Sequence, residues 1–136
     1  SHWESILSLN NRRRMELDQL YQIGAVVEEK ENFVVEVALF RESVIFDAHF
    51  PGNPILPGAC ITDIVKCCAE KVLNQSLEIK SVRNLKFLQI IHPDNVANLK
   101  ITLKISSAND ELVCKAIVAS DAIVFSKMDL YLISRS

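Results

Sequence analysis

The sequence HFPGNPILPG at residues 49–58, followed by ACITDIVKCCAEKVL at residues 59–73, decides the fold of this chain. The first stretch holds three of the four prolines and two of the three glycines, a composition that disrupts regular strands and helices and favours a structured loop. Pro57 suits the start of a helix, where a missing N–H costs little. Apolar residues then recur at helical spacing: Cys60, Ile64, Cys67, Cys68 and Val72. We therefore predict a constrained loop that leads into one long helix from Ala59 to Leu73.

On both sides of this helix the apolar residues alternate with polar ones, as in β-strands. Before the loop, the alternation from Ile23 to Val27 and from Phe33 to Leu39 predicts a hairpin with its turn at residues 29–32. After the helix, turn residues separate four further predicted strands: Ile79 to Ile91, Val96 to Ser106, Leu112 to Ser120 and Ile123 to Ile133. His92 precedes Pro93 between two of these strands and is interpreted as a turn residue. Residues 1–20 have mixed three- and four-residue spacings, which predict a helical N-terminal segment.

One long helix and about six antiparallel strands must bury their apolar sides against each other. The predicted fold class is therefore α+β, with an antiparallel sheet wrapped round a central helix. A length of 136 residues suits a single domain covering residues 1–136.

Charge and composition exclude several classes of function. The net charge of −2 provides no general attraction for nucleic acid or an anionic membrane, so neither is expected as a partner. No apolar run approaches the roughly 20 residues that a membrane helix needs. The four cysteines lack zinc-site spacing, and they predict reduced thiols, a cytoplasmic location, no metal and no cofactor: Cys60, Cys67, Cys68 and Cys114.

The loop at residues 49–58 resembles the signature loop of the hot-dog-fold 3-hydroxyacyl-acyl-carrier-protein dehydratases of fatty acid synthesis, the FabA/FabZ type. Its His, Pro, Gly, Pro, Pro and Gly stand in the family's order at fixed offsets. From about Tyr21 to the C-terminus the order of elements is also similar, more loosely. The resemblance implies a hot-dog fold and the conversion of 3-hydroxyacyl thioesters to trans-2-enoyl thioesters, in fatty acid or related polyene biosynthesis. The acyl group would be carried on the phosphopantetheine of an acyl carrier protein, or on coenzyme A.

The resemblance also implies which residues do the chemistry. It assigns His49 and, fourteen residues later, Asp63 as the acid/base pair. A neutral imidazole can remove the proton beside the thioester carbonyl, and a protonated carboxyl can protonate the departing hydroxyl. Asp63 would need apolar surroundings to raise its pKa for that role, and Ile61 and Ile64 are expected to help provide them. By themselves, a histidine in a proline-rich loop and an aspartate on a helix are usually structural or exposed.

Gly58 is the predicted oxyanion donor, because it stands at the helix start, where free N–H groups and the positive dipole end point outward. Without a side chain it would let the thioester approach the backbone. In the family the histidine and the acid that face each other come from different subunits. The resemblance therefore implies a homodimer or a higher even oligomer.

Three features mark a divergent member of the family. Cys67 stands four residues after Asp63, where these dehydratases commonly have a glutamine that helps hold the site. The usual Pro-Gly-Asp turn is replaced by Pro-Asp-Asn at residues 93–95. The N-terminal segment lacks the arginine- and aspartate-bearing stretch of many relatives. Aspartate at position 63 resembles the branch that also isomerises its product, but one residue does not assign isomerase activity.

Two other functions remain open on the sequence. A hot-dog thioesterase would use an acid on the central helix to activate water and would not need His49. A non-catalytic, acyl-carrier-binding subunit would keep the loop for packing, and Cys67 would then mark a decayed site. The retained pair of His49 and Asp63 favours the dehydratase.

Overall fold

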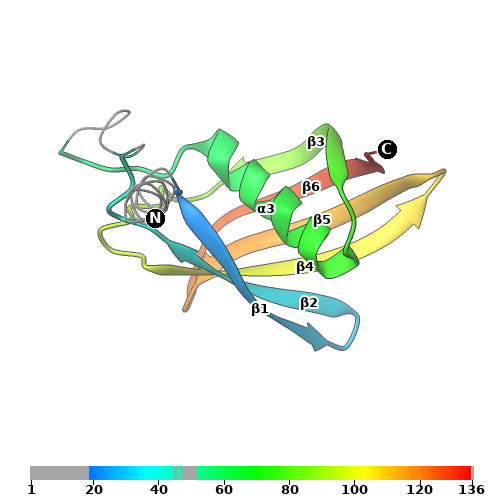
Figure 1. Ribbon diagram of the computed structural model, residues 1–136, viewed down its shortest axis with the longest axis horizontal. Helices are drawn as coiled ribbons and strands as arrows, with labels where there is room; N and C mark the ends of the chain where they lie inside the picture. Colours follow the sequence, from blue (N-terminus) through cyan, green and yellow to red (C-terminus); the bar gives the residue numbers. More distant parts are fainter. Residues whose placement is uncertain (1–18, 45, 47–51, 136) are drawn as a thin grey trace, which may run out of the picture.

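The computed structural model describes residues 19–44, 46 and 52–135. The predicted N-terminal helix therefore lies almost entirely outside the described residues. The described part forms a long helix and six strands: β1 (Tyr21–Glu29), β2 (Asn32–Leu39), α3 (Gly58–Leu73), β3 (Leu77–Phe87), β4 (Asn98–Ala108), β5 (Glu111–Ser120) and β6 (Ile123–Ser134). The strands form one antiparallel sheet in the order β1-β2-β4-β5-β6-β3, and α3 lies across one face of it (Figure 1). The predicted α+β hot-dog architecture is confirmed.

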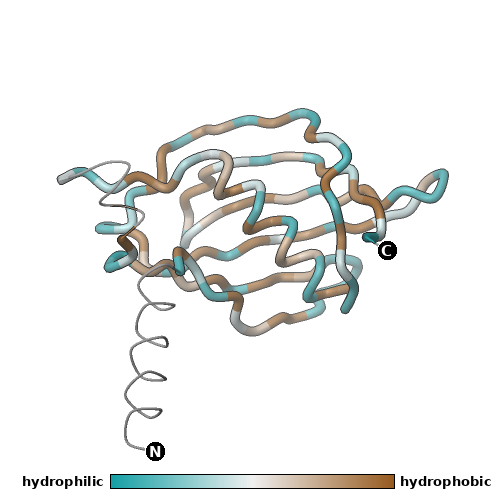
Figure 2. The backbone as a smooth tube through the Cα atoms, turned by 45° about the horizontal axis from the view of Figure 1, so that its top comes forward, coloured by the Kyte–Doolittle hydropathy of each residue, from teal (hydrophilic) through white to brown (hydrophobic). Residues whose placement is uncertain are grey.

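The turns between neighbouring strands contain residues with a left-handed backbone. Asn109 and Asp110 both have positive φ and join β4 to β5 as a two-residue hairpin loop, the conformation of a type I′ turn. Lys30 and Asp121 have positive φ in the turns between β1 and β2 and between β5 and β6. The polar β4–β5 turn is seen as the teal tip on the right of Figure 2.

Helix α3 begins one residue earlier than predicted, because Pro57 has an extended backbone and serves as the N-cap. The helix ends at Leu73, and the next residue, Asn74, caps it: its backbone is left-handed and its N–H donates to the carbonyl of Glu70. The buried face consists of Ile61, Ile64, Val65, Cys68 and Ala69. Cys60 and Cys67, which we predicted within the apolar stripe, are only half-buried at its margins.

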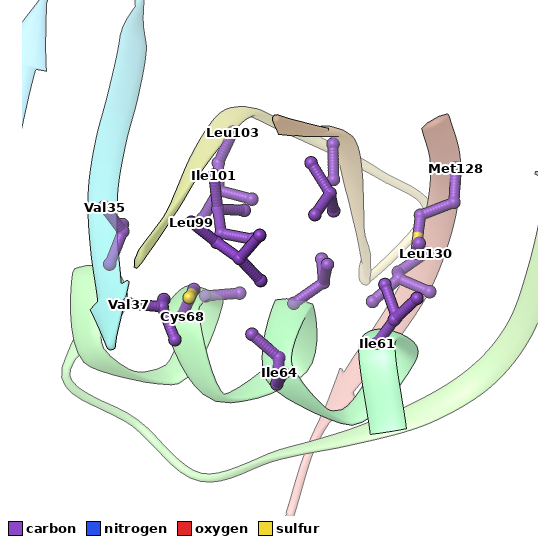
Figure 3. Packing of buried hydrophobic residues seen from close by; sticks show 14 of the residues in the cluster. Val35, Val37, Ile61, Ile64, Cys68, Leu99, Ile101, Leu103, Met128 and Leu130 are labelled. Carbon is purple, nitrogen blue, oxygen red and sulfur yellow. The ribbon is translucent and has the colours of Figure 1, made fainter. Parts of the chain in front are cut away.

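The core lies between this helical face and the concave side of the sheet. Figure 3 shows Ile61, Ile64 and Cys68 of α3 pointing toward side chains of the sheet. These come from three strands and are almost fully buried: Val35 and Val37 of β2, Leu99, Ile101 and Leu103 of β4, and Met128 and Leu130 of β6. No helix in the described part of the chain is long and apolar enough to span a membrane.

Strand β3 differs most from the sequence prediction, because it ends at Phe87 and not at Ile91. The register with β6 shifts twice, and Asn84 has positive φ within the second irregularity. Beyond Phe87, the N–H groups of Leu88 and Gln89 both donate to the carbonyl of Phe125. The N–H of Leu56 then donates to the carbonyl of Ile91 at 2.9 Å, so residues 88–91 leave the sheet and hold the loop before α3.

Candidate active site

His49 lies outside the described residues, so the structure gives the geometry of the other two predicted site residues, Asp63 and Gly58, and of their surroundings. Asp63 lies on the second turn of α3 with an exposed side chain, while its neighbours Ile64 and Val65 are fully buried. Ile61 and Ile64 do belong to the core, as expected. Their buried side chains do not enclose Asp63, however: among the described residues the apolar surroundings that we expected for it are absent, and its side chain is exposed beside Tyr21 at the start of β1.

The side chain of Asp63 is held by a residue that the sequence did not single out. The hydroxyl of Tyr21, at the start of β1, lies 2.9 Å from Oδ2 of Asp63 and donates to it. The same hydroxyl lies 3.1 Å from Sγ of Cys67. Because Asp63 and Cys67 are four residues apart, they stand one above the other on the same side of α3. Tyr21, Asp63 and Cys67 thus form a three-residue cluster, which we call the tyrosine cluster.

Burial keeps Tyr21 and Cys67, two members of the tyrosine cluster, protonated. The pKa of Tyr21 is raised far above its ordinary value of 10.0, chiefly because burial disfavours the phenolate and then because of the contacts with Cys67 and Asp63. The pKa of the Cys67 thiol is raised, also mainly by burial, although the Tyr21 hydrogen bond opposes this. Tyr21 is therefore a neutral hydrogen-bond donor throughout the physiological range.

Other charged groups lie on the same stretch of the helix. Nζ of Lys66 is 3.2 Å from Oε1 of Glu70. Burial lowers the pKa of Lys66, but Glu70, Cys67 and Asp63 together raise it by more, so the pKa is raised overall. The pKa of Cys60 is raised by burial and by the nearby charge of Asp63. Lys71 donates to the carbonyl of Gly24 at 2.8 Å, which ties α3 to β1. Asp63 thus lies beside one ion pair and two protonated thiols.

Gly58 is the first residue of α3, as predicted, but its missing side chain has a different structural reason. A Cβ atom at Gly58 would lie 2.6 Å from Cζ of Phe87, because the phenyl ring packs against the glycine. The space that we expected for the thioester is therefore bounded by an aromatic ring. The first N–H groups of the helix still have no intrahelical acceptor and remain suited to bind an anionic oxygen.

A groove of about 470 Å³ begins at Gly58 and is lined almost entirely by apolar side chains. One wall is formed by residues 55–58 and Ile61, and the other by residues 87–91. Phe87, Leu88 and Ile90 on this wall are 52%, 51% and 60% exposed. An apolar groove at the start of a helix can take a hydrocarbon chain or a flat apolar surface.

The sequence led us to predict Asp63 and Gly58 as site residues, but it did not draw attention to Tyr21 or to the wall at residues 87–91. The replacement of glutamine by Cys67 was a signal that something else must fill the space beside Asp63. Nothing in the local sequence pointed to Tyr21, which lies 42 residues before Asp63. The wall was hidden because its apolar residues continue the pattern of β3.

Comparisons with known proteins point to one family. Residues 25–126, three quarters of the chain, match the ApeI-like family, described as ApeI dehydratase. A 3-hydroxyacyl-acyl-carrier-protein dehydratase FabZ of Lactiplantibacillus plantarum is 28% identical over 100 residues, which are 68% of this chain and 68% of that protein. FabZ of Latilactobacillus sakei is 27% identical over 81 residues, 51% of this chain and 58% of that protein.

Solved structures agree on the fold. The dehydratase heterocomplex ApeI:P from Xenorhabdus doucetiae superimposes with a TM-score of 0.64 at 19% identity, covering 84% of this chain and 97% of that one. A putative thioesterase from Shewanella oneidensis superimposes with a TM-score of 0.52 at 12% identity, covering 94% and 99%. At these identities the superpositions show only that the fold is shared. The family match, in contrast, is a match of sequence and covers residues 25–126. This chain belongs to the ApeI-like dehydratase family and is a divergent hot-dog dehydratase relative.

Proposed function

We propose that this protein removes water from 3-hydroxyacyl thioesters, presented on an acyl carrier protein or on coenzyme A, and that His49 and Asp63 are its acid/base pair. The observation that carries the proposal is the carboxyl group of Asp63. It is exposed on α3, and the half-buried phenol of Tyr21, at the start of β1, donates a hydrogen bond to it at 2.9 Å.

The proposed reaction needs three groups. His49 takes the proton from C2 of the acyl chain, while Asp63 gives a proton to the hydroxyl on C3, so that water leaves and a C2–C3 double bond forms. The charge that develops on the thioester oxygen is met by N–H groups at the start of α3, with Gly58 first among them. The groove at Gly58 would take an apolar part of the substrate or of a partner subunit.

The site as described is open, and we propose that a second subunit completes it. Asp63 is exposed on α3, and the groove wall at residues 87–91 exposes three large apolar side chains next to the edge strand β3. Such a patch on a small protein marks an interaction surface. A second copy of the chain would supply the facing histidine in a homodimer, and a related dehydratase subunit would do so in a heterocomplex of the kind formed by ApeI:P.

The test is turnover of short 3-hydroxyacyl and trans-2-enoyl thioesters on a carrier protein and on coenzyme A, followed through the enoyl absorbance. His49→Ala and Asp63→Asn should each lower turnover by about 10²- to 10⁴-fold. Asp121→Asn changes an exposed carboxylate in the β5–β6 turn and should turn over like the wild type. Full turnover by both site variants would refute the assignment of the pair.

The same samples distinguish the two other functions. Release of free thiol without an enoyl product would identify a thioesterase, which the fold also supports. A wild-type protein that binds the acyl carrier but turns over only when mixed with a second dehydratase subunit would show that the chain works in a heterocomplex. No turnover in any combination would favour the non-catalytic subunit.

A further inference from the structure

We propose that Tyr21 is a positioning residue for the dehydration described above: its hydroxyl fixes the carboxyl group of Asp63, and Cys67 provides the space in which it does so. The inference rests on the proposed function and adds a residue that the signature loop and the helix motif do not contain. It is carried by the geometry of the tyrosine cluster.

The ring of Tyr21 is well suited to hold a partner still. It packs against the hydrophobic core, and its backbone is paired with Leu39 in β2. A tyrosine has only two side-chain torsions, so a packed ring places its hydroxyl with little freedom. An exposed aspartate on a helix has no such restraint, and its carboxyl rotates among several orientations. The 2.9 Å hydrogen bond from Tyr21 selects one of them.

The hydrogen bond also determines which carboxyl oxygen is left for the reaction. Tyr21 contacts Oδ2 of Asp63, so Oδ1 is the oxygen that would face the hydroxyl of the substrate. The neutral phenol acts as a donor whether or not Asp63 carries its proton between turnovers. A carboxyl group held within a few tenths of an ångström of its productive position is what acid catalysis requires.

Cys67 explains how a side chain from β1 can reach Asp63. Its Sγ lies 3.1 Å from the Tyr21 hydroxyl, and a thiol ends closer to the helix than a longer side chain would. The phenol has a single hydrogen, so it donates to Asp63 or to Cys67 at any instant, and the protonated thiol can donate back to the phenol oxygen. A glutamine at position 67 would instead reach Asp63 directly, since Gln and Asp four residues apart on a helix form a hydrogen bond.

The experiment compares two tyrosine-to-phenylalanine variants in the turnover assay. The chain has only two tyrosines, and Tyr131 lies on the other side of the molecule, with Arg83 over its ring at 4.3 Å. Tyr21→Phe should lower kcat by about 10- to 100-fold and leave KM within about twofold, because the carboxyl group loses its orientation while substrate binding is unchanged. Tyr131→Phe should match the wild type.

A rescue distinguishes positioning from packing. Adding Cys67→Gln to Tyr21→Phe supplies an amide donor for Asp63 from the helix itself, and should recover most of the lost kcat. The neighbouring charges of Lys66 and Glu70 and the thiols of Cys60 and Cys67 are the same in both tyrosine variants, so they cannot produce a difference between them.

A second readout does not depend on activity. With ¹³C at Cζ of tyrosine, the Tyr21 resonance should move as Asp63 titrates, and this movement should disappear in Asp63→Asn. If Tyr21→Phe turns over as fast as Tyr131→Phe, or loses kcat only in proportion to unfolded protein, the positioning role is refuted and the dehydratase stands. A wild-type protein inert toward every thioester refutes the proposed function, and the role of Tyr21 in it, together.

Discussion

At the scale of single residues, the carboxylate of Glu70 joins the end of α3 to the start of β3. Its Oε2 accepts the N–H of Leu77 at 2.9 Å, and this bond, with the ion pair to Lys66, lowers the pKa of Glu70 below its ordinary value of 4.5. A lowered folded-state pKa means that the stabilisation is present above about pH 4.5 and is lost as the pH falls through the folded value. Glu70→Gln should therefore reduce the free energy of unfolding by about 1 kcal/mol at pH 7.

Urea unfolding at a series of pH values measures this contribution. The difference between wild type and Glu70→Gln should shrink as the pH falls below 4.5, and it should vanish once the pH is below the lowered folded-state pKa, because both side chains are then neutral. Glu78→Gln, an exposed position on β3, should show little difference at any pH. A Glu70→Gln deficit that stays constant with pH would mean that the charge is not responsible.

At Ser126, in contrast to Glu70, removing the polar group should raise the free energy of unfolding. Its side chain on β6 is fully buried, and within the described part of the chain its hydroxyl has no hydrogen-bond partner. A buried, unsatisfied hydroxyl costs stability, so Ser126→Ala should raise the free energy of unfolding by about 1 kcal/mol. Ser134→Ala is the control, since it removes a 2.9 Å bond to Gln75 and should lower stability slightly. A destabilised Ser126→Ala protein would reveal a partner for the hydroxyl.

Residue spacing, combined with the family resemblance, was enough to predict Asp63 as a site residue, because its offset from His49 lies within one stretch of sequence. It was not enough to find Tyr21, because the contact joins β1 to α3 and depends on how the hairpin lies against the helix. Gly58 was found for an incomplete reason. Its need for a bare Cα comes from the ring of Phe87, and no local pattern encodes that contact.

At the scale of elements, lysines face each other directly on the outer side of the sheet. Lys104 on β4 is opposite Lys115 on β5, and both are exposed. Like charges in cross-strand pairs are unfavourable, so Lys104→Glu should stabilise the protein by about 0.5 kcal/mol, and added salt should reduce this gain. Thermal unfolding at low and high salt measures both effects.

The neighbouring strand offers a matched control of opposite sign. Lys100 on β4 is opposite Glu36 on β2, so Lys100→Glu creates a like-charge pair and should lower stability. If both variants shift the melting temperature by the same amount in the same direction, the cause is the β-strand propensity of glutamate and not its charge.

Hairpins with two-residue turns were the elements that sequence predicted best. Alternating residues on both sides of a left-handed turn fix strand bounds to within about two residues, as in β1, β2, β5 and β6. The end of β3 was predicted four residues too late, because its apolar pattern continues to Ile91. Its true end depends on two register shifts and on bonds to Phe125, which belong to the folded sheet.

At the scale of the whole molecule, the groove wall should decide the oligomeric state. Ile90 is 60% exposed beside the edge strand β3, so a charge there would be buried without a partner in an assembled protein. Ile90→Asp should dissociate the assembly and abolish turnover while the fold is retained, as measured by sedimentation and circular dichroism. Ile123→Asp, at a residue that is 45% exposed in the β5–β6 turn region, should leave the mass unchanged. An Ile90→Asp protein of wild-type mass would exclude this surface as the interface.

The position of β1 at the margin of the sheet has a consequence for heat inactivation. β1 has one strand neighbour, β2, and its pairing is interrupted between Ile23 and Val26. Edge strands fray first, and their backbone amides exchange with solvent at lower temperatures than the amides of the core strands. If Tyr21 orients Asp63, each fraying of β1 breaks the Tyr21–Asp63 hydrogen bond while β4, β5 and β6 stay paired. Enzymatic rate should then decline several degrees below the melting temperature, in step with deuterium uptake in residues 21–26.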